Sequence, residues 1–62
     1  MPSPGRLIRE ARLQSGLSQQ RLARRVGTKQ SAISRLEADE VSPSVETLDQ
    51  LLRETDAETL PA

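Results

Sequence analysis

The feature that most constrains this chain is a pair of short helical patterns that meet at a single glycine. Leu22 and Val26 are four residues apart, a spacing that marks one apolar face of a helix. Ile33 and Leu36, three residues apart, mark a second face. Gly27 lies between the two patterns, and glycine most easily adopts the left-handed conformation that ends a helix. The sequence therefore predicts two short helices, joined by a sharp turn, whose apolar faces pack together.

The residues around this turn favour the same two helices. Ser18 is a good N-cap for a helix over residues 19–26, and the Thr28 hydroxyl can cap a helix over about residues 29–38. Ala23 keeps the first helix thin where the second crosses it closely. A larger side chain at this position would push the two helices apart.

Two further helices are predicted on either side of this pair. The first covers residues 6–15 and ends at Gly16, while the last follows a loop over residues 39–44 and ends near Thr55. Both helices carry apolar residues at helical spacing, which we expect to face inward: Leu7, Ile8 and Ala11 in the first, and Val45, Leu48, Leu51 and Leu52 in the last. The predicted fold is a compact all-α domain of four helices, or of five if residues 56–62 form a terminal turn.

The length of the chain limits it to one small domain. A chain of 62 residues buries about 60% of its unfolded surface, which predicts modest stability. We expect a flexible leader over residues 1–5, the folded domain over residues 6–55, and a tail or short terminal turn over residues 56–62.

Missing residue types exclude several classes of function. The absence of Cys and His excludes disulfides, thiolate chemistry and the usual zinc ligands, so we expect no metal and no cofactor. The absence of Phe, Tyr and Trp removes the platform on which single-stranded bases stack. No apolar run approaches the length of a membrane span, and nothing marks a secreted protein, so we expect a cytoplasmic protein. The chain has carboxylates but no histidine, no cysteine and no phosphate-binding glycine loop, which also argues against an enzyme.

The charges are separated along the chain although the net charge is zero. Residues 1–35 contain eight basic residues and one acidic residue, whereas residues 36–62 contain one basic residue and eight acidic residues. This separation suits a polyanion that approaches the basic half from one side. The alternative is that the arginines only solvate helix surfaces, but that explanation does not account for the separation.

The helix predicted over about residues 29–38 has a polar outer face. With Ile33 and Leu36 inside, the helical repeat places a set of other residues outside: Ser31, Ser34, Arg35 and Ala38, with Gln30 in the exposed first turn. Glutamine can pair with adenine through two hydrogen bonds in the major groove, arginine can pair with guanine, and serine can reach several bases. These residue types indicate a helix that reads double-stranded DNA, and an ordinary solvated face is the alternative.

The segment "LSQQRLARRVGTKQSAISRLE", residues 17–37, resembles the helix-turn-helix of the phage-repressor and Cro-like family, also called the xenobiotic-response-element family. Upstream, "IREAR" at residues 8–12 resembles the first helix of that family, and "SPSVETLDQLL" at residues 42–52 resembles its fourth helix. The family's apolar positions, small residue and turn glycine are all filled here, by Leu22, Val26, Ile33, Leu36, Ala23 and Gly27.

The resemblance implies roles for nine residues of this chain. Base-reading positions are matched by Gln30, Ser31 and Arg35, with Ser34 as a second-rank candidate. Phosphate-binding positions are matched by Gln19, Thr28 and Lys29, and Gln19 begins a helix whose dipole favours an anion. Arg12 and Glu37 match a partly buried ion pair between the first and third helices, for which we favour a structural role.

The chain departs from the family in two places. The family carries glycine and basic residues in the loop after the third helix, where this chain has Asp39 and Glu40, so nonspecific DNA affinity should be weaker. The family usually dimerises through a fifth helix or C-terminal domain, whereas this chain ends in "DAETLPA". A homodimer, pairing of copies on adjacent half-sites, and a protein partner bound by the acidic C-terminal half all stay open.

The resemblance implies sequence-specific binding of double-stranded DNA, as a repressor-like regulator of transcription in the cytoplasm, associated with the nucleoid. The alternative function is a protein-interaction module, such as an antitoxin or the docking domain of a larger regulator. Steep weakening of binding with salt would distinguish DNA binding from an apolar protein interface.

Overall fold

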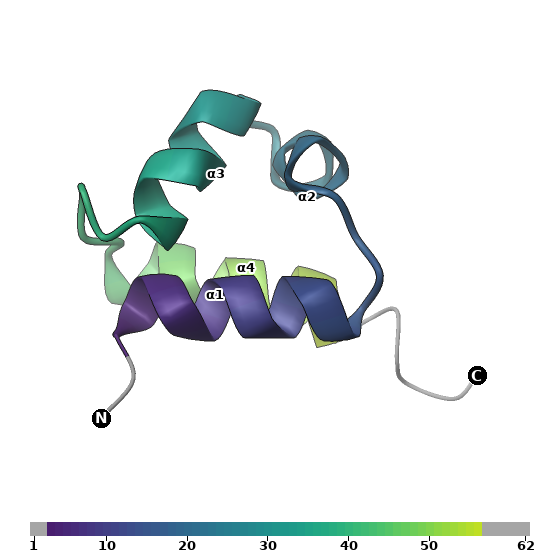
Figure 1. Cartoon of the computed structure of the whole chain (residues 1–62), viewed down its shortest axis with the longest axis horizontal. Coiled ribbons are helices and arrows are strands. Elements are labelled where there is room, and N and C mark those ends of the chain that lie inside the picture. Colours follow the sequence, from purple (N-terminus) through teal and green to yellow (C-terminus); the bar gives the residue numbers. More distant parts are fainter. Residues whose placement is uncertain (1–2, 57–62) are drawn as a thin grey trace.

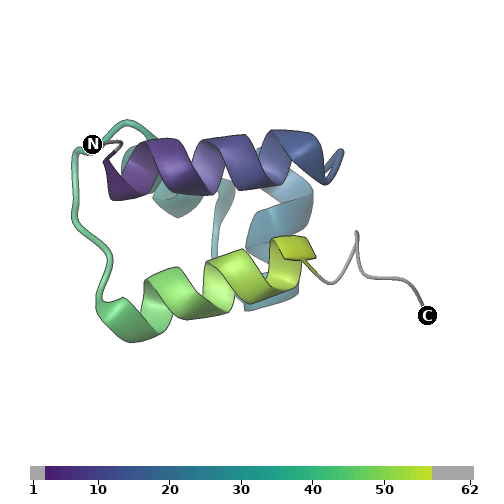
Figure 2. The same cartoon turned by 90° about the horizontal axis from the view of Figure 1, so that it is seen from below.

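The structure is a computed structural model that describes residues 3–56 of the chain. It contains four α-helices in the described residues and no strand: α1 (Pro4–Gln14), α2 (Gln19–Val26), α3 (Gln30–Glu37) and α4 (Val45–Asp56). Helices α1 and α4 run in the same direction along one side of the domain, and α2 and α3 pack above them (Figures 1 and 2). The predicted all-α fold with four helices is confirmed. The tail or fifth helix was predicted over residues 56–62; Asp56 is instead the last residue of α4, and residues 57–62 lie outside the described residues.

Helices α2 and α3 form the predicted helix-turn-helix. The Ser18 hydroxyl accepts a hydrogen bond from the backbone N–H of Arg21 at 3.0 Å, so Ser18 caps α2 as predicted. Gly27 ends α2 with φ 76° and ψ 34°, the left-handed conformation that a side chain would disfavour. The Thr28 N–H then donates to the Ala23 carbonyl at 2.8 Å and closes the turn.

The prediction that Thr28 caps the second of these helices is wrong. Helix α3 begins at Gln30, its N-cap is Lys29, and no side chain makes the capping hydrogen bond. The backbone of Thr28 is used to close the preceding turn, which places the residue one position too early to cap α3. The N–H groups of Ala32 and Ile33 donate to the Lys29 carbonyl, at 3.0 and 3.3 Å. The N–H groups of Gln30 and Ser31 have no capping side chain, so they can donate to another acceptor.

A small aliphatic core holds the four helices together. It consists of buried residues from all four helices and from the α1–α2 connection, with Val26 and Leu48 packed against it: Ile8, Leu17, Leu22, Ala23, Ile33, Leu36 and Leu51. The predictions for Leu7 and Val45 are wrong, because their exposed fractions are 39% and 85%. The buried stripe of α1 instead runs through Gly5, Ile8 and Arg12.

The inward face of α4 is shifted toward its C-terminal end. Val45 is the first residue of this helix and extends beyond the core, whereas Leu51 and Thr55 are 1% exposed. The Ser15 hydroxyl donates to the Thr55 carbonyl at 2.6 Å and joins the ends of α1 and α4. Thr55 in turn donates its hydroxyl to the Leu52 carbonyl at 2.7 Å, so the buried polar side chain is satisfied.

Helix α1 begins two residues before its predicted start at Arg6. Ser3 caps it by accepting from the Arg6 N–H at 3.2 Å, and Pro4 occupies its first position, where proline needs no hydrogen-bond partner. Residues 3–5 therefore belong to the helix and its cap rather than to a flexible leader. Asp39, held at φ 59°, accepts from the Ser3 hydroxyl at 2.6 Å and from the Gly5 N–H at 3.1 Å.

Gly5 allows α1 to touch the C-terminal end of α3. A Cβ atom at Gly5 would lie 2.3 Å from the carbonyl oxygen of Leu36, well inside contact distance. We expect Gly5→Ala to lower the free energy of unfolding by about 1–3 kcal/mol from overpacking, which exceeds the ~0.5–1 kcal/mol that alanine gains as a helix former. Thermal unfolding measures this difference, and an unchanged or raised midpoint would contradict the close approach.

Candidate nucleic-acid interface

The four predicted base-reading residues lie on one exposed face of α3. Gln30, Ser31, Ser34 and Arg35 are all exposed, while Ile33 and Leu36 on the opposite face are 0% and 9% exposed. The core therefore fixes which side of α3 meets solvent, because a rotation of the helix would expose Ile33. Hydrogen-bonding side chains consequently project from a rigid element, as recognition of base edges requires.

The three predicted phosphate-binding residues lie beside this face. Gln19 is the first residue of α2 and is half-buried, whereas Thr28 and Lys29 are exposed in the turn before α3. The N-termini of α2 and α3 carry the partial positive charge of their helix dipoles. Backbone N–H groups and side chains therefore offer hydrogen-bond donors to an anion, and the helix dipoles favour its negative charge.

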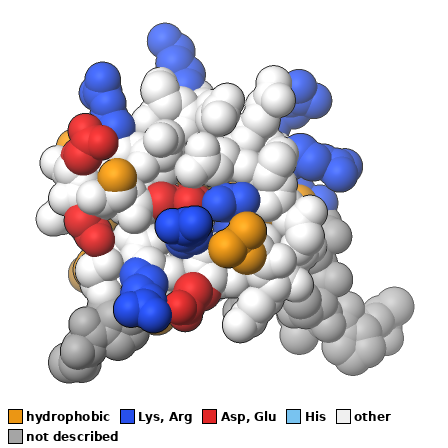
Figure 3. Space-filling view, viewed as in Figure 1, with side chains coloured by type: hydrophobic (Ala, Val, Ile, Leu, Met, Phe, Trp, Pro, Cys, Tyr) orange, Lys and Arg blue, Asp and Glu red, His pale blue; other side chains and the backbone are white. Residues whose placement is uncertain are grey.

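Basic side chains surround α2 and α3. The space-filling view shows Lys and Arg side chains along the upper edge of the domain, over these two helices (Figure 3). The exposed basic residues of the two helices and their turn are Arg21, Arg24, Arg25, Lys29 and Arg35. Sequence reasoning predicted a basic half of the chain, and the fold brings that charge to the helix-turn-helix.

Arg12 and Glu37 form an ion pair that joins α1 to α3. The Arg12 Nε donates to Glu37 Oε2 at 2.6 Å, and its Nη2 donates to Oε1 at 3.1 Å. The third guanidinium nitrogen, Nη1, donates to the Leu17 carbonyl at 3.0 Å. The two side chains are only 11% and 5% exposed, so both charges are partnered within the fold.

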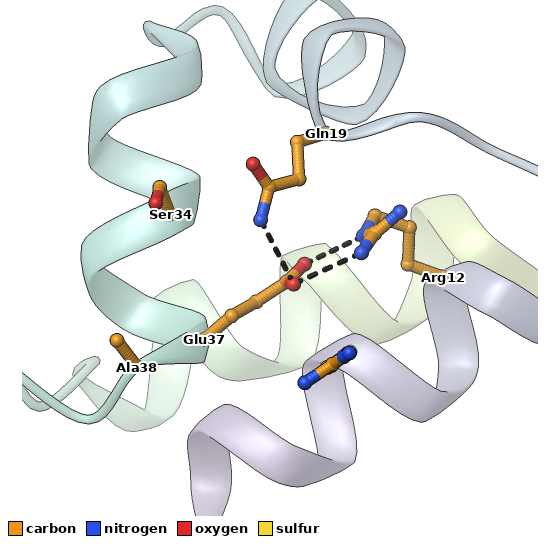
Figure 4. Close-up of a pocket in the computed structure, with 6 residues that line it drawn as sticks. Arg12, Gln19, Ser34, Glu37 and Ala38 are labelled. Atoms are coloured by element: carbon orange, nitrogen blue, oxygen red, sulfur yellow. Dashed lines mark hydrogen bonds and ion pairs between the residues drawn. The ribbon is translucent and has the colours of Figure 1, made fainter.

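The ion pair is also connected to the predicted DNA-contacting residues. Gln19 donates from Nε2 to Glu37 Oε1 at 3.1 Å, and Gln30 donates from Nε2 to Gln19 Oε1 in a longer contact of 3.4 Å. Figure 4 shows the Gln19 side chain pointing down between α2 and α3 toward Glu37. Sequence reasoning missed this connection, since residues 18 positions apart leave no periodic signal.

A surface hollow lies where α1, α2 and α3 meet. It has a volume of about 320 Å³ and is lined by Arg9, Arg12, Gln19, Ser34, Glu37 and Ala38 (Figure 4). Sequence reasoning did not select Arg9, an exposed residue on α1 that lies at this hollow. The positive charge of Arg9 can be read from the sequence, but its position beside α3 depends on how α1 packs against that helix.

The acidic loop after α3 is partly used inside the fold. The Asp39 carboxylate accepts from Ser3 and Gly5 in the first turn of α1, where the positive end of the helix dipole stabilises it. Glu40 is exposed in the same loop. The contact with α1 therefore holds the Asp39 carboxylate against that helix while its negative charge remains.

Two other kinds of site are not found in the described residues. Among residues 3–56, no three His, Cys, Asp or Glu side chains are grouped so that they could hold a metal ion. No helix in that part of the chain is both long and apolar enough to cross a membrane.

The sequence of this chain is similar to known helix-turn-helix proteins. The profile of a helix-turn-helix family matches residues 8–60. The HTH-type transcriptional regulator PuuR of Escherichia coli (strain K12) is 49% identical over 51 residues, which is 82% of this chain and 28% of that protein. The Shigella flexneri regulator of the same name gives the same identity and coverage. The chain thus spans about 28% of the length of these relatives, and no solved structure matches it significantly.

Proposed function

This chain belongs to the helix-turn-helix family of DNA-binding transcriptional regulators, and on that premise we propose that it reads a short duplex site with α3 in the major groove. The observation that carries the proposal is the exposed polar face of α3, which the buried Ile33 and Leu36 hold in one orientation. The family is one of regulators rather than enzymes.

In this proposal each exposed polar side chain of α3 contacts a different part of the duplex. Gln30 projects from the first turn and pairs with adenine through its amide, while Arg35 contacts guanine or a nearby phosphate. Ser31 lies next to Gln30 and reaches an adjacent base edge. Ser34, which borders the hollow near α1, is the second-rank contact.

The phosphate contacts fix the register of α3 on the duplex. Gln19 at the start of α2 binds one phosphate with its amide, and Thr28 and Lys29 bind the backbone beside the turn. These contacts carry no sequence information directly, but they determine which base pair each α3 side chain meets. Their loss should therefore weaken binding to all sequences alike.

We further propose that this domain belongs to a repressor-like regulator of transcription. The regulator acts in the cytoplasm, where it occupies an operator on the chromosome and is thereby associated with the nucleoid. A single domain makes few phosphate contacts, so pairing of two copies on adjacent half-sites would multiply its affinity. The acidic half of the chain, which DNA repels, suits a protein partner instead.

Replacing Gln30 with alanine separates base reading from phosphate binding. We expect Gln30→Ala to cost about 1–3 kcal/mol on the preferred duplex and to relax selection at one base pair. Lys29→Ala is the contrasting variant, because it removes a proposed phosphate contact and the loss should be similar on all duplexes. Titration of both variants against preferred and random duplexes measures the difference.

Gln20, an exposed neighbour of Gln19, provides the matched control for these alanine variants. Gln20→Ala removes an exposed glutamine amide, as Gln30→Ala does, but from α2. This control should leave binding to both duplexes close to that of the wild type. An equal loss for Gln30→Ala on preferred and random duplexes would contradict base reading by Gln30. A strongly site-dependent loss for Lys29→Ala would contradict its assignment to phosphate.

A further inference from the structure

The side chains of Glu37, Gln19 and Gln30 form a directed series of hydrogen bonds. Glu37 pairs with Arg12, and its carboxylate oxygens can only accept hydrogen bonds. The contact of 3.1 Å between Glu37 Oε1 and Gln19 must therefore use the amide nitrogen of Gln19 as donor. The identity of a single buried group thus fixes which way the Gln19 amide points.

The orientation of Gln19 determines the orientation of the next amide. With its nitrogen held by Glu37, Gln19 presents Oε1 toward Gln30 at 3.4 Å. An oxygen accepts only from a donor, so Gln30 places Nε2 toward Gln19. The Gln30 amide then has its Oε1 and one remaining N–H for an outside partner.

We propose that Glu37 is a positioning residue for base reading, which acts through Gln19 to fix the amide of Gln30 so that it selects adenine over guanine. This proposal rests on the proposed function and deepens it. Adenine offers a donor at N6 and an acceptor at N7, which match the free oxygen and N–H of Gln30. Guanine offers two acceptors, O6 and N7, and therefore repels an outward amide oxygen.

Burial makes Glu37 effective in this role. Its side chain is 5% exposed and is bound by two nitrogens of Arg12, so the carboxylate does not turn away to solvent. Gln30 is exposed and on its own would rotate its amide freely, presenting either end to DNA. The buried carboxylate of Glu37 therefore limits, through Gln19, the orientations of the exposed Gln30 amide.

Glu37→Gln tests the proposal, because an amide at this position can accept or donate and no longer fixes the polarity of Gln19. The probe is a pair of duplexes that differ only in adenine or guanine at the base pair where Gln30→Ala relaxes selection. We expect the wild-type preference for adenine to fall about five- to tenfold in Glu37→Gln, within the range that one bidentate contact provides. Glu10→Gln removes the same charge from an exposed acid on α1 and should keep the preference.

A second variant protects the test against loss of the fold. Arg12→Met with Glu37→Met removes both buried charges and replaces them with apolar side chains of similar length, a change that buried ion pairs often tolerate. The preference for adenine should fall in this double variant as well. An equal loss of affinity on both duplexes, in whichever variants fold, would assign Glu37 a structural role only and overturn the proposal.

NMR of the free 62-residue chain tests the orientation of the amides without DNA. We expect the side-chain N–H of Gln19 to exchange with water more slowly than that of exposed Gln20, and to lose this protection in Glu37→Gln. Equal exchange for Gln19 and Gln20 would overturn the proposal. A protected Gln19 amide in a protein that shows no base preference would instead contradict the proposed function and leave the orientation of Gln19 standing.

Discussion

Replacing Glu37 with alanine should lower the free energy of unfolding by about 3–5 kcal/mol, the usual cost of leaving one charge of a buried ion pair without its partner. The Arg12 side chain is 11% exposed, and its guanidinium would lose two of its three hydrogen bonds to the protein. Gln19 would lose its acceptor at the same time. In so small a domain, this loss should leave a large fraction of the protein unfolded at room temperature.

Chemical or thermal unfolding of Glu37→Ala measures this cost. Glu10→Ala is the matched control, because Glu10 pairs with Arg6 at 3.1 Å while the two side chains are 53% and 70% exposed. An exposed pair of this kind contributes about 0.2–1 kcal/mol, so the control should unfold close to the wild type. Similar losses in the two variants would show that burial adds nothing to the Arg12–Glu37 pair.

Replacing Ile33 with alanine should cost about 2–5 kcal/mol, because it removes buried methyl and methylene groups and leaves a cavity. Ile33 is 0% exposed and belongs to the core on the inner face of α3. The same core holds the outer face of this helix in place, so the variant should also lose DNA binding. The loss should extend to every duplex sequence, since the whole helix is affected.

Val45→Ala is the control for this second substitution. Val45 is also β-branched, but it is 85% exposed, so its truncation should change stability by no more than about 0.5 kcal/mol. Denaturant unfolding compares both variants with the wild type under one condition. A midpoint for Ile33→Ala within error of that for Val45→Ala would contradict the assignment of the core.

Local patterns explain why the helix-turn-helix could be predicted from the sequence. Ser18, the apolar spacing of α2 and Gly27 act within a few residues of one another, and the structure has α2 over the predicted residues 19–26. The inner face of α3 followed from the helical repeat in the same way. These features depend on neighbours along the chain rather than on the rest of the fold.

Contacts between distant residues explain what the sequence left out. The start of α1 depends on Ser3, which is linked to Asp39 across 36 positions, and on the close approach of Gly5 to Leu36. The exposure of Val45 depends on where α4 crosses the core. These contacts do not follow from local propensity, and they hide the inward face of α4 from sequence reasoning. The start of α1 also had a local signal that was missed, because Ser3 caps the helix and Pro4 occupies its first position.

The candidate site also has features that depend on local sequence and features that depend on contacts between distant residues. The exposed residues of α3 could be selected from their helical positions, and their roles toward DNA stay predictions. The contact between Gln19 and Glu37 joins two helices and emerges only once α1, α2 and α3 are packed together. Sequence reasoning therefore selected the candidate residues, but it did not predict the hydrogen bonds that join Gln30, Gln19 and Glu37.

Selection of DNA from a randomised duplex library tests the central claim most directly. The purified 62-residue chain would be mixed with the library at low and moderate salt, and the retained DNA would be sequenced. Reading by α3 predicts an enriched short motif, and half-sites about one helical turn apart would indicate two copies on one site. Retention without any enriched motif, or no retention at all, would contradict sequence-specific recognition by this domain.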